Sequence, residues 1–413
     1  MVDGRADRLH WERVGAATVK GMEMPRAMDW ITRLIEAETV SRDPNRPVID
    51  LVCAEAERLG LTPTVLPHAT DPGKANLVVT VPAQDGATTG GIVLSGHSDV
   101  VPVDGQSWSS EPFRAEVRQG RLYGRGAADM KGFIGICVDR LKDFVAADLA
   151  EPLHLVLTYD EEVGCRGGEV VVKEIADLGL VPRIAFVGEP SMMQVIRGHK
   201  SVNAIDVTFR GVAAHSSLAP QAVNAVEHAA RFTTKVRERT DHWRKDGPFD
   251  DDFVIPHSTG GVNTITGGIA FNTVPEECGV QMEFRSVPAH GPRERIIEEF
   301  RDLAAQIERE MKAEDDRASV SFDVLASVPG LDTAPDAPAV QLAHELGGIP
   351  SEEKVTYATE AGQFSESGID AVIVGPGDIA DAHTADESVS LDQLVDCEKF
   401  MQRLVQNITL DRR

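Results

Sequence analysis

The sequence predicts an α/β fold in which a mostly parallel sheet is flanked by helices and a ferredoxin-like α+β domain is inserted. Two observations lead to this prediction. Apolar runs with the length of buried strands alternate with helical patterns as far as Glu189, which is typical of a parallel sheet covered by helices. Beyond Pro190 the expected elements follow the order β-α-β-β-α-β, which defines the ferredoxin-like unit.

Residues 1–197 are expected to form the first part of the main domain. Apolar residues at three- and four-residue spacing predict helices over 28–37 and 48–60. Short apolar runs predict buried strands at 92–96, 153–159 and 184–187. The segment 329–413 is expected to complete this domain, because another buried strand, 371–374, follows the inserted segment.

The inserted domain is expected over residues 198–328, and the segment that begins at Pro329 has the composition of a linker back to the main domain. Its expected elements are a strand at 202–210, a helix at 222–239, paired strands at 261–273 and 277–287, a helix at 293–311 and a strand at 318–326.

Composition excludes several classes of protein. The 413 residues carry a formal net charge of −25, which argues against nucleic acid or an anionic membrane as a partner. No apolar run approaches the roughly 20 residues that span a bilayer. Five cysteines without a Cys-x-x-Cys pair indicate reduced thiols, with Cys53 and Cys137 in the core, and a cytoplasmic protein. The first 22 residues lack a signal sequence, and translation is expected to start at Met22 or Met24.

Five acidic or histidine residues follow four of the predicted strands and one glycine-rich turn. Ligands in open α/β sheets gather beyond the carboxyl ends of the strands, so these side chains are expected to converge. Two imidazoles and three carboxylates together suit a divalent metal, most of all zinc, and a hydrolase. The predicted metal ligands are His97, Asp129, Glu162, Glu189 and His383.

Each of these residues has a simpler explanation when it is taken alone: a structural histidine, a helix cap at Asp129, or a surface glutamate. The triplet Asp160-Glu-Glu could be a solvated turn, but it follows an apolar run, and three carboxylates there need compensating cations. Glu161 and Glu162 point to opposite sides of an extended backbone, so one can bind metal while the other acts as general base. Asp99 is placed to fix the tautomer of His97.

A competing motif lies just before His383. Gly375, Gly377 and Ala380 match the spacing of a dinucleotide-binding fingerprint. That fingerprint needs a following helix, a further strand and an acidic residue, and too little chain remains to supply them. The glycines are therefore expected to let this loop pass close to the metals.

Together the motifs Gly-His-Ser-Asp, Gly-Arg-Gly-Ala-Ala-Asp-Met-Lys-Gly, Asp-Glu-Glu-Val-Gly-Cys and Gly-Glu-Pro-Ser resemble the zinc-dependent aminoacylase and carboxypeptidase family. The resemblance covers nearly the whole chain after Met24 and implies two divalent ions, zinc or alternatively cobalt. It implies that His97 and Glu189 hold one ion, that Glu162 and His383 hold the other, and that Asp129 bridges them. It further implies Glu161 as general base and Asp99 as the residue that orients His97.

The resemblance also implies a homodimer formed through the inserted domain, with His215 reaching the partner's site to stabilise an oxyanion. Within the family, the stretches around Asp160 and Tyr357 are most similar to acetylornithine deacetylases, so the expected substrate is a small N-acyl amino acid. The open alternatives are a desuccinylase, an aminoacylase, a dipeptidase or a catalytically silent metal-binding protein. The substrate contacts expected on this basis are Asn272 and Arg285 on the lid and Glu360, which departs from some relatives.

Overall fold

The computed structural model describes residues 23–410 and divides into two compact units. Of the described residues, the first unit contains 23–197, Thr333–Ser351 and 359–410. The second unit contains Gly198–Asp332 and Glu352–Ala358. The first 22 residues, for which the sequence analysis made its prediction of a later translation start, lie outside the described part of the chain.

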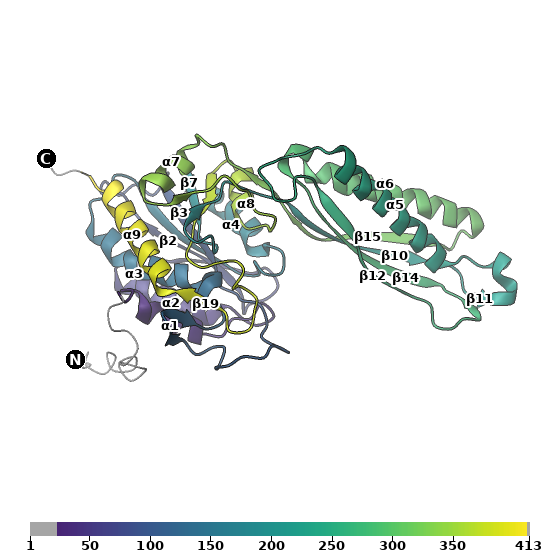
Figure 1. Ribbon diagram of the computed structural model, residues 1–413, viewed down its shortest axis with the longest axis horizontal. Coiled ribbons are helices and arrows are strands. Elements are labelled where there is room, and N and C mark those ends of the chain that lie inside the picture. Colours follow the sequence, from purple (N-terminus) through teal and green to yellow (C-terminus); the bar gives the residue numbers. More distant parts are fainter. Residues whose placement is uncertain (1–22, 411–413) are drawn as a thin grey trace. The chain divides into compact units, whose positions relative to one another are not determined.

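The first unit is built on a six-stranded sheet with the order β1-β2-β6-β3-β7-β18. Of these strands, β2, β3 and β7 are labelled in Figure 1. The strands β6, β3, β7 and β18 run parallel to one another, whereas β1 and β2 join one edge in antiparallel pairs. The prediction of a mostly parallel sheet is thereby confirmed. The strands are β1 (Thr64–Pro67), β2 (Ala75–Val81), β3 (Ile92–His97), β6 (Leu153–Thr158), β7 (Ile184–Val187) and β18 (Asp370–Ile373).

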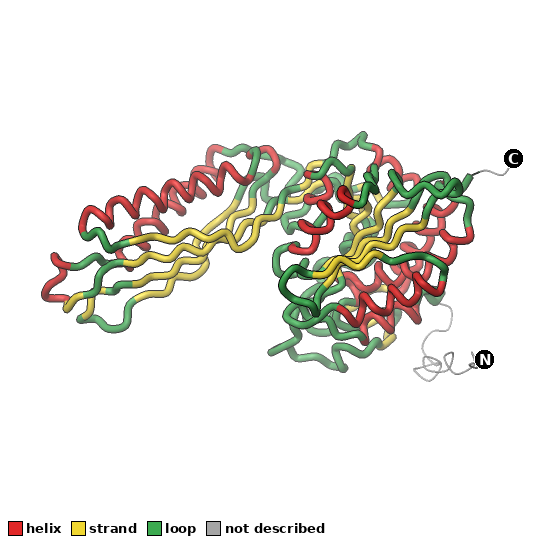
Figure 2. The backbone as a smooth tube through the Cα atoms, turned by 180° about the vertical axis from the view of Figure 1, so that it is seen from behind, coloured by secondary structure: helices red, strands yellow, loops and turns green. Residues whose placement is uncertain are grey.

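Helices cover both faces of this sheet (Figure 2). A β-carbon on Gly96 would contact Ile134 of α3, whereas the hydroxyl of Ser95 lies 3.4 Å from Glu360, which immediately precedes α8. Because successive residues of a strand point to opposite faces, α3 and α8 flank β3 from opposite sides. The helices of this unit are α1 (Met28–Glu36), α2 (Arg46–Arg58), α3 (Gly132–Ala146), α4 (Arg166–Asp177), α7 (Pro338–Glu345), α8 (Ala361–Glu366) and α9 (Leu391–Asn407).

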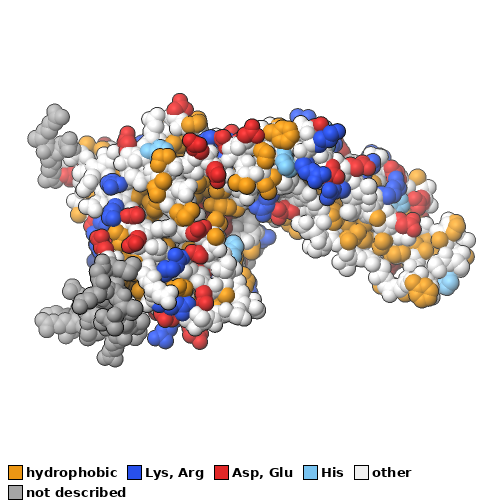
Figure 3. Space-filling view, viewed as in Figure 1, with side chains coloured by type: hydrophobic (Ala, Val, Ile, Leu, Met, Phe, Trp, Pro, Cys, Tyr) orange, Lys and Arg blue, Asp and Glu red, His pale blue; other side chains and the backbone are white. Residues whose placement is uncertain are grey.

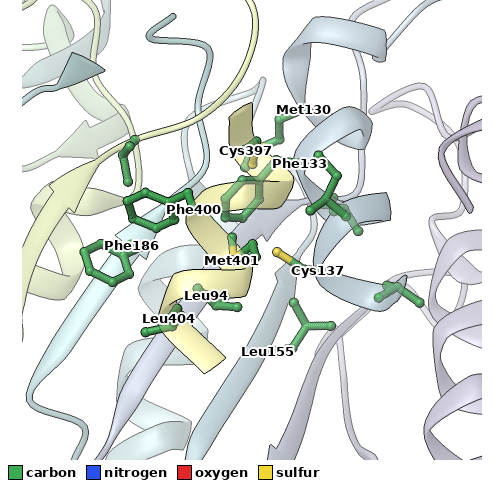
Figure 4. Close-up of a cluster of buried hydrophobic side chains, with 14 of the residues drawn as sticks. Leu94, Met130, Phe133, Cys137, Leu155, Phe186, Cys397, Phe400, Met401 and Leu404 are labelled. Carbon is green, nitrogen blue, oxygen red and sulfur yellow. The ribbon is translucent and has the colours of Figure 1, made fainter. Parts of the chain in front are cut away.

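The core of the first unit lies between the sheet and the helices α3 and α9 (Figure 4). Leu394, Cys397, Met401 and Leu404 recur at three- and four-residue spacing and are buried, which gives α9 one apolar face. Short strands complete the unit: β4 (Glu116–Arg118), β5 (Arg121–Tyr123) and β19 (Ser388–Ser390) form one small sheet, and β8 (Gln194–Val195) pairs with β17 (Ile349–Pro350).

The second unit has the predicted β-α-β-β-α-β order and an antiparallel sheet, β12-β14-β10-β15. Its elements are β10 (Val202–Arg210), α5 (Ala225–Asp246), β12 (Thr259–Gly267), β14 (Glu277–Arg285), α6 (Arg293–Glu314) and β15 (Ser319–Val328). Ile205, Val207 and Phe209 alternate along β10 and are buried with α5 and α6, because every second residue faces the helices. Acidic and basic side chains are interspersed on the outer surface of this unit (Figure 3).

Two segments that were expected in the main domain pack with the second unit instead. Leu331–Asp332 (β16) pairs with Gly198–His199 (β9), which extends this unit beyond residue 328. Lys354 forms ion pairs with Asp250 at 2.7 Å and Asp332 at 2.9 Å, so residues 352–358 join the same unit.

No helix within residues 23–410 is long and apolar enough to cross a membrane.

Candidate metal centre

The five predicted metal ligands occupy one edge of the first unit. His97 is the last residue of β3, and Glu162 and Glu189 follow β6 and β7 at the same edge, because these strands are parallel. His383 lies in the loop after β18, and Asp129 lies in the turn Ala127–Lys131 directly before α3, where its own backbone is not helical. The sheet topology therefore gathers residues that are up to 286 positions apart in the chain.

Asp129 joins the two imidazoles. Its Oδ1 lies 2.9 Å from His97 Nε2, and its Oδ2 lies 3.2 Å from His383 Nε2. Glu189 Oε1 lies 3.7 Å from His97 Nε2, and Glu162 Oε2 lies 2.9 Å from His383 Nε2. Each imidazole is thus paired with its own glutamate and shares Asp129, which is an arrangement suited to two cations.

The chemistry of these donors fits divalent metal. His97 forms a group with Glu161 and Glu189 and another with Asp129 and Glu162, and in each group one ligand atom per residue lies within 4.8 Å of the others. Glu189 Oε1 is buried and accepts no hydrogen bond within the described chain. A buried carboxylate oxygen without a donor needs a cation beside it. Imidazole and carboxylate are ordinary zinc ligands.

The electrostatics of the site also call for positive charge. Burial alone would lower the pKa of His97, but the hydrogen bond to Asp129 and the charge of Glu189 raise it well above its usual value. Hydrogen bonds to Asp129 and Glu162 raise the pKa of His383 to about 10. The carboxylates around the two imidazoles are in excess and therefore favour the protonated, positively charged form of both.

Asp99 holds His97 through its main chain. His97 Nδ1 lies 2.8 Å from the Asp99 backbone carbonyl oxygen and 3.8 Å from the carboxylate Oδ1. The carboxylate instead accepts hydrogen bonds from the Ser41 hydroxyl at 2.7 Å and from the Glu161 backbone N–H at 3.1 Å. The sequence led us to expect the carboxylate to fix the tautomer, whereas the structure gives that contact to the carbonyl and uses the carboxylate to position Glu161.

The acidic triplet is compensated in part by a lysine that the sequence analysis missed. Lys74 Nζ lies 2.5 Å from Asp160 Oδ1 and 2.6 Å from the Ser41 carbonyl oxygen, and both charged side chains are buried. Only Glu161 and Glu162 of the triplet therefore face the candidate metal site. Lys74 stands 86 positions before Asp160 and lies just before an apolar strand, so no local pattern marked it as a partner.

Glu161 is held next to the centre by a thiol. The Sγ of Cys165 donates to Glu161 Oε1 at 3.1 Å. Loss of hydration in the surrounding protein and the negative charge of Glu162 together raise the pKa of Glu161 to about 8, against the opposing attraction of His97. A general base needs a raised pKa and a place next to the reacting water. Glu161 has the raised pKa and lies beside the candidate metal ligands.

Glu360 precedes α8 and lies next to β3, at the level of Ser95 rather than of His97. Its Oε2 is 3.4 Å from the hydroxyl of Ser95, two residues before His97 and on the same face of β3. The side chain is 1% exposed, Oε1 has no partner in the described chain, and burial raises its pKa to about 7.

The remaining predicted residues belong to the second unit. His215 lies on β11 (Ala214–His215), which pairs with β13 (Thr273–Val274), and the N–H of Ser216 donates to the carbonyl of Asn272 at 3.0 Å. His215 and Asn272 are therefore neighbours, and both are exposed. Arg285 ends β14 and contacts Glu283 at 2.7 Å.

The glycines before His383 do not open a dinucleotide-binding helix. The next helix after β18 is α9, which begins only at Leu391. Gly377 has a φ of 98° and a β-carbon there would lie 3.1 Å from Ala128, the neighbour of Asp129. The glycine thus lets the loop approach the turn that carries Asp129, in agreement with the sequence analysis.

The chain is similar in sequence to a family of hydrolases and to known deacetylases. The model of peptidase family M20/M25/M40 matches residues 93–407. Acetylornithine deacetylases of Myxococcus xanthus and Proteus mirabilis are 35% and 31% identical to the chain, over 92% and 94% of its length and 97% and 98% of their own.

Solved structures agree at the level of fold. A tripeptidase from Staphylococcus aureus has a TM-score of 0.70 at 20% identity, covering 94% of this chain and 99% of its own. A dinuclear metal-binding peptidase of the M20 family from Bacillus subtilis has a TM-score of 0.64 at 14% identity, covering 93% and 98%. At these identities the similarity establishes the fold alone.

Proposed function

This chain belongs to peptidase family M20/M25/M40, and on that premise we propose that it is a metal-dependent amide hydrolase that removes the acetyl group from N2-acetyl-ornithine. The products would be ornithine and acetate, which places the enzyme in arginine biosynthesis and, as we further propose, in the cytoplasm. The observation that carries the hydrolytic activity is the bridge from Asp129 to His97 and His383 beside Glu161. The acetylated substrate rests on the full-length similarity to acetylornithine deacetylases.

We assign the ligands to two zinc ions. His97 and Glu189 would hold one ion, His383 and Glu162 would hold the other, and Asp129 would contribute one oxygen to each. When bound, such ions acidify water and polarise an acyl carbonyl. The short contacts of both Asp129 oxygens support this assignment, because each oxygen already faces a different imidazole.

The protein's own residues would carry the proton. Glu161 takes a proton from the attacking water and then delivers it to the amine that leaves. Its raised pKa suits both steps, since the carboxylate must be basic enough to accept a proton and acidic enough to release it. The Asp99 carboxylate and the Cys165 thiol hold Glu161 from its backbone and its side chain.

Recognition of substrate would use the second unit of two subunits. His215 and Asn272 lie at the end of the sheet where β14 begins, whereas Arg285 is the last residue of β14. Nine extended residues span about 26 Å, so His215 and Arg285 of one chain cannot touch the same small substrate. A homodimer resolves this: His215 of one subunit would stabilise the oxyanion in its partner's site, and Asn272 of one subunit and Arg285 of the other would bind the substrate carboxylate.

Glu360 is proposed as the residue that discriminates among acylated amino acids. Its Oε1 is buried without a donor, and an ammonium on the substrate side chain would supply one. Of the expected substrates, N2-acetyl-ornithine carries such an ammonium and N-acetyl-methionine does not.

The test compares amine release from N2-acetyl-ornithine, N-succinyl-diaminopimelate and N-acetyl-methionine, with zinc or cobalt and after chelation. Metal-dependent preference for acetyl-ornithine supports the proposal. Preference for another substrate would leave the proposed amide hydrolysis in place and change the assigned substrate to that of a desuccinylase, aminoacylase or dipeptidase. Inactivity on all three with metal bound would favour a catalytically silent metal-binding protein instead.

A variant pair tests the base and the shared site. Glu161→Gln should lower kcat by about 100- to 10,000-fold while metal stays bound, whereas Glu169→Gln, an exposed glutamate paired with Lys173, should leave it unchanged. Mixing Glu161→Gln subunits with His215→Ala subunits should restore part of the activity. Verified mixed dimers without any recovery would contradict sharing, and near-normal turnover by Glu161→Gln would contradict the base.

A further inference from the structure

Glu387 is a buried carboxylate that the sequence analysis did not single out. It lies four residues after His383 and is 1% exposed. Its Oε1 accepts hydrogen bonds from the backbone N–H groups of Ala128 and Asp129, both at 3.0 Å. Its Oε2 accepts from the backbone N–H of Gly126 at 3.1 Å. One side chain therefore holds three N–H groups of the turn that carries Asp129.

The charge of Glu387 is balanced by an equally buried arginine. Arg125 Nη1 donates to Glu387 Oε2 at 2.7 Å, and both side chains are 1% exposed. Arg125 Nη2 donates to Gln106 Oε1 at 2.6 Å. A buried carboxylate that is paired with an arginine and accepts hydrogen bonds from several N–H groups is held in one orientation.

The same network reaches the other side of the metal centre. Gln106 Nε2 donates to the backbone carbonyl of His383 at 2.8 Å, and Arg125 Nη1 lies 3.3 Å from the carbonyl of Thr384. A continuous chain of hydrogen bonds thus runs from the N–H of Asp129 through Glu387, Arg125 and Gln106 to the backbone of His383. It connects two loops that are more than 250 residues apart in sequence.

We propose that Glu387 and Arg125 are positioning residues that set the separation of Asp129 and His383 and thereby fix the second of the two metal sites. This rests on the proposed two-metal centre and names the groups that give it its geometry. The contacts are to main-chain atoms, so they act on the path of both loops. Residues that orient metal ligands from behind typically change metal affinity by about 10- to 100-fold when they are replaced.

Glutamine at position 387 would break the arrangement without removing its shape. A carboxylate offers two oxygen acceptors to the four donors, whereas an amide offers one oxygen and one NH2 group that would face N–H donors. Glu387→Gln should therefore move the turn of Asp129 relative to His383, although its volume is unchanged. Glu398→Gln is the matched control, because Glu398 is also buried and accepts the backbone N–H of Ala27 at 2.7 Å. It lies on α9 and contacts the residue before α1 rather than the site loops.

The experiment titrates the metal-free full-length protein with Co2+ and records stoichiometry, affinity and the visible absorption spectrum. Wild type and Glu398→Gln should bind two ions with the same spectrum. Glu387→Gln should bind the second ion 10- to 100-fold more weakly, with an altered spectrum from the site that contains His383. Folding of each variant is checked by circular dichroism.

Gln106→Ala and Arg125→Lys provide further variants if Glu387→Gln does not fold. Gln106→Ala removes the hydrogen bond to the His383 carbonyl and leaves the contact of Glu387 with the Asp129 N–H intact. It should therefore lower the affinity for the second ion. Two tight ions and an unchanged spectrum in a folded Glu387→Gln, or in both other variants, would overturn the positioning role. Failure of wild type itself to bind two ions would instead overturn the proposed metal centre, so the two outcomes are distinguishable.

Discussion

The buried pair between Lys74 and Asp160 offers a quantitative test of how the acidic triplet is held. The two side chains are 10% and 7% exposed and their charged atoms are 2.5 Å apart. Lys74→Met removes the ammonium but keeps an unbranched apolar stem. Asp160 would then remain buried next to Glu161 and Glu162 without its lysine.

The expected loss follows from this burial. Removing one partner of a buried ion pair costs about 3–5 kcal/mol, because the other charge is left uncompensated. Such a loss is a large part of the roughly 5–15 kcal/mol that stabilises a folded protein. The double variant Lys74→Met/Asp160→Asn strands no charge, so it should lose at least 1 kcal/mol less than the sum of the two single variants, as expected for contacting groups.

Urea unfolding of the four proteins, followed by tryptophan fluorescence, measures these differences. Lys173→Met is the control, because its pair with Glu169 has both side chains more than 60% exposed and should be worth less than about 1 kcal/mol. A loss for Lys74→Met no larger than that for Lys173→Met would refute the argument that Lys74 compensates a buried carboxylate. Additive single losses would refute direct coupling.

Three further predictions concern other parts of the molecule. Burial lowers the pKa of His199 to about 4 from its ordinary value of 6.5, so between these pH values the unfolded state binds more protons than the folded state. The stability of the second unit should therefore fall by about 3 kcal/mol as the pH drops from 7 to below 4. Urea unfolding at the two pH values should show that His199→Gln largely removes this loss. Cys165→Ser keeps a donor to Glu161 and should keep kcat, whereas Cys165→Val should lower kcat up to about tenfold; equal kcat values would contradict a role for the thiol. Gly188→Ala would place a β-carbon 2.1 Å from the ring of Phe133 and should cost about 1–3 kcal/mol in thermal unfolding, whereas Gly261→Ala, which meets nothing within 4 Å, should cost less.

The parts of the fold that follow from local pattern could be predicted from sequence. The alternation of buried and partly exposed residues over 202–210 and the helical spacing over 293–311 place β10 and α6 within a few residues of their bounds. The convergence of the candidate site residues could be predicted for a related reason. Each follows an apolar strand or a glycine-rich turn, and parallel strands necessarily bring their carboxyl ends to one edge.

Contacts between distant polar residues could not be predicted in this way. Arg125 and Glu387 are separated by 262 positions, and neither lies in a pattern that names the other. Which atom of Asp99 faces His97 depends on the local path of the chain after β3, since the carbonyl and the carboxylate belong to the same residue. Sequence identifies the groups that perform chemistry more readily than the groups that hold them in place.

The two buried charge pairs explain how so many carboxylates can be assembled at one edge of a sheet. Asp160 is next to Glu161 and Glu162 in sequence, and its own charge is neutralised from outside the centre by Lys74. Glu387 approaches Asp129 from the opposite side and is neutralised by Arg125. In both cases a carboxylate outside the candidate ligand set anchors a loop. The lysine or arginine paired with it reduces the repulsion between this carboxylate and the carboxylates of the candidate ligands. The remaining negative charge is therefore confined to the residues that face the candidate metal sites, where protons on the imidazoles or bound cations can offset it.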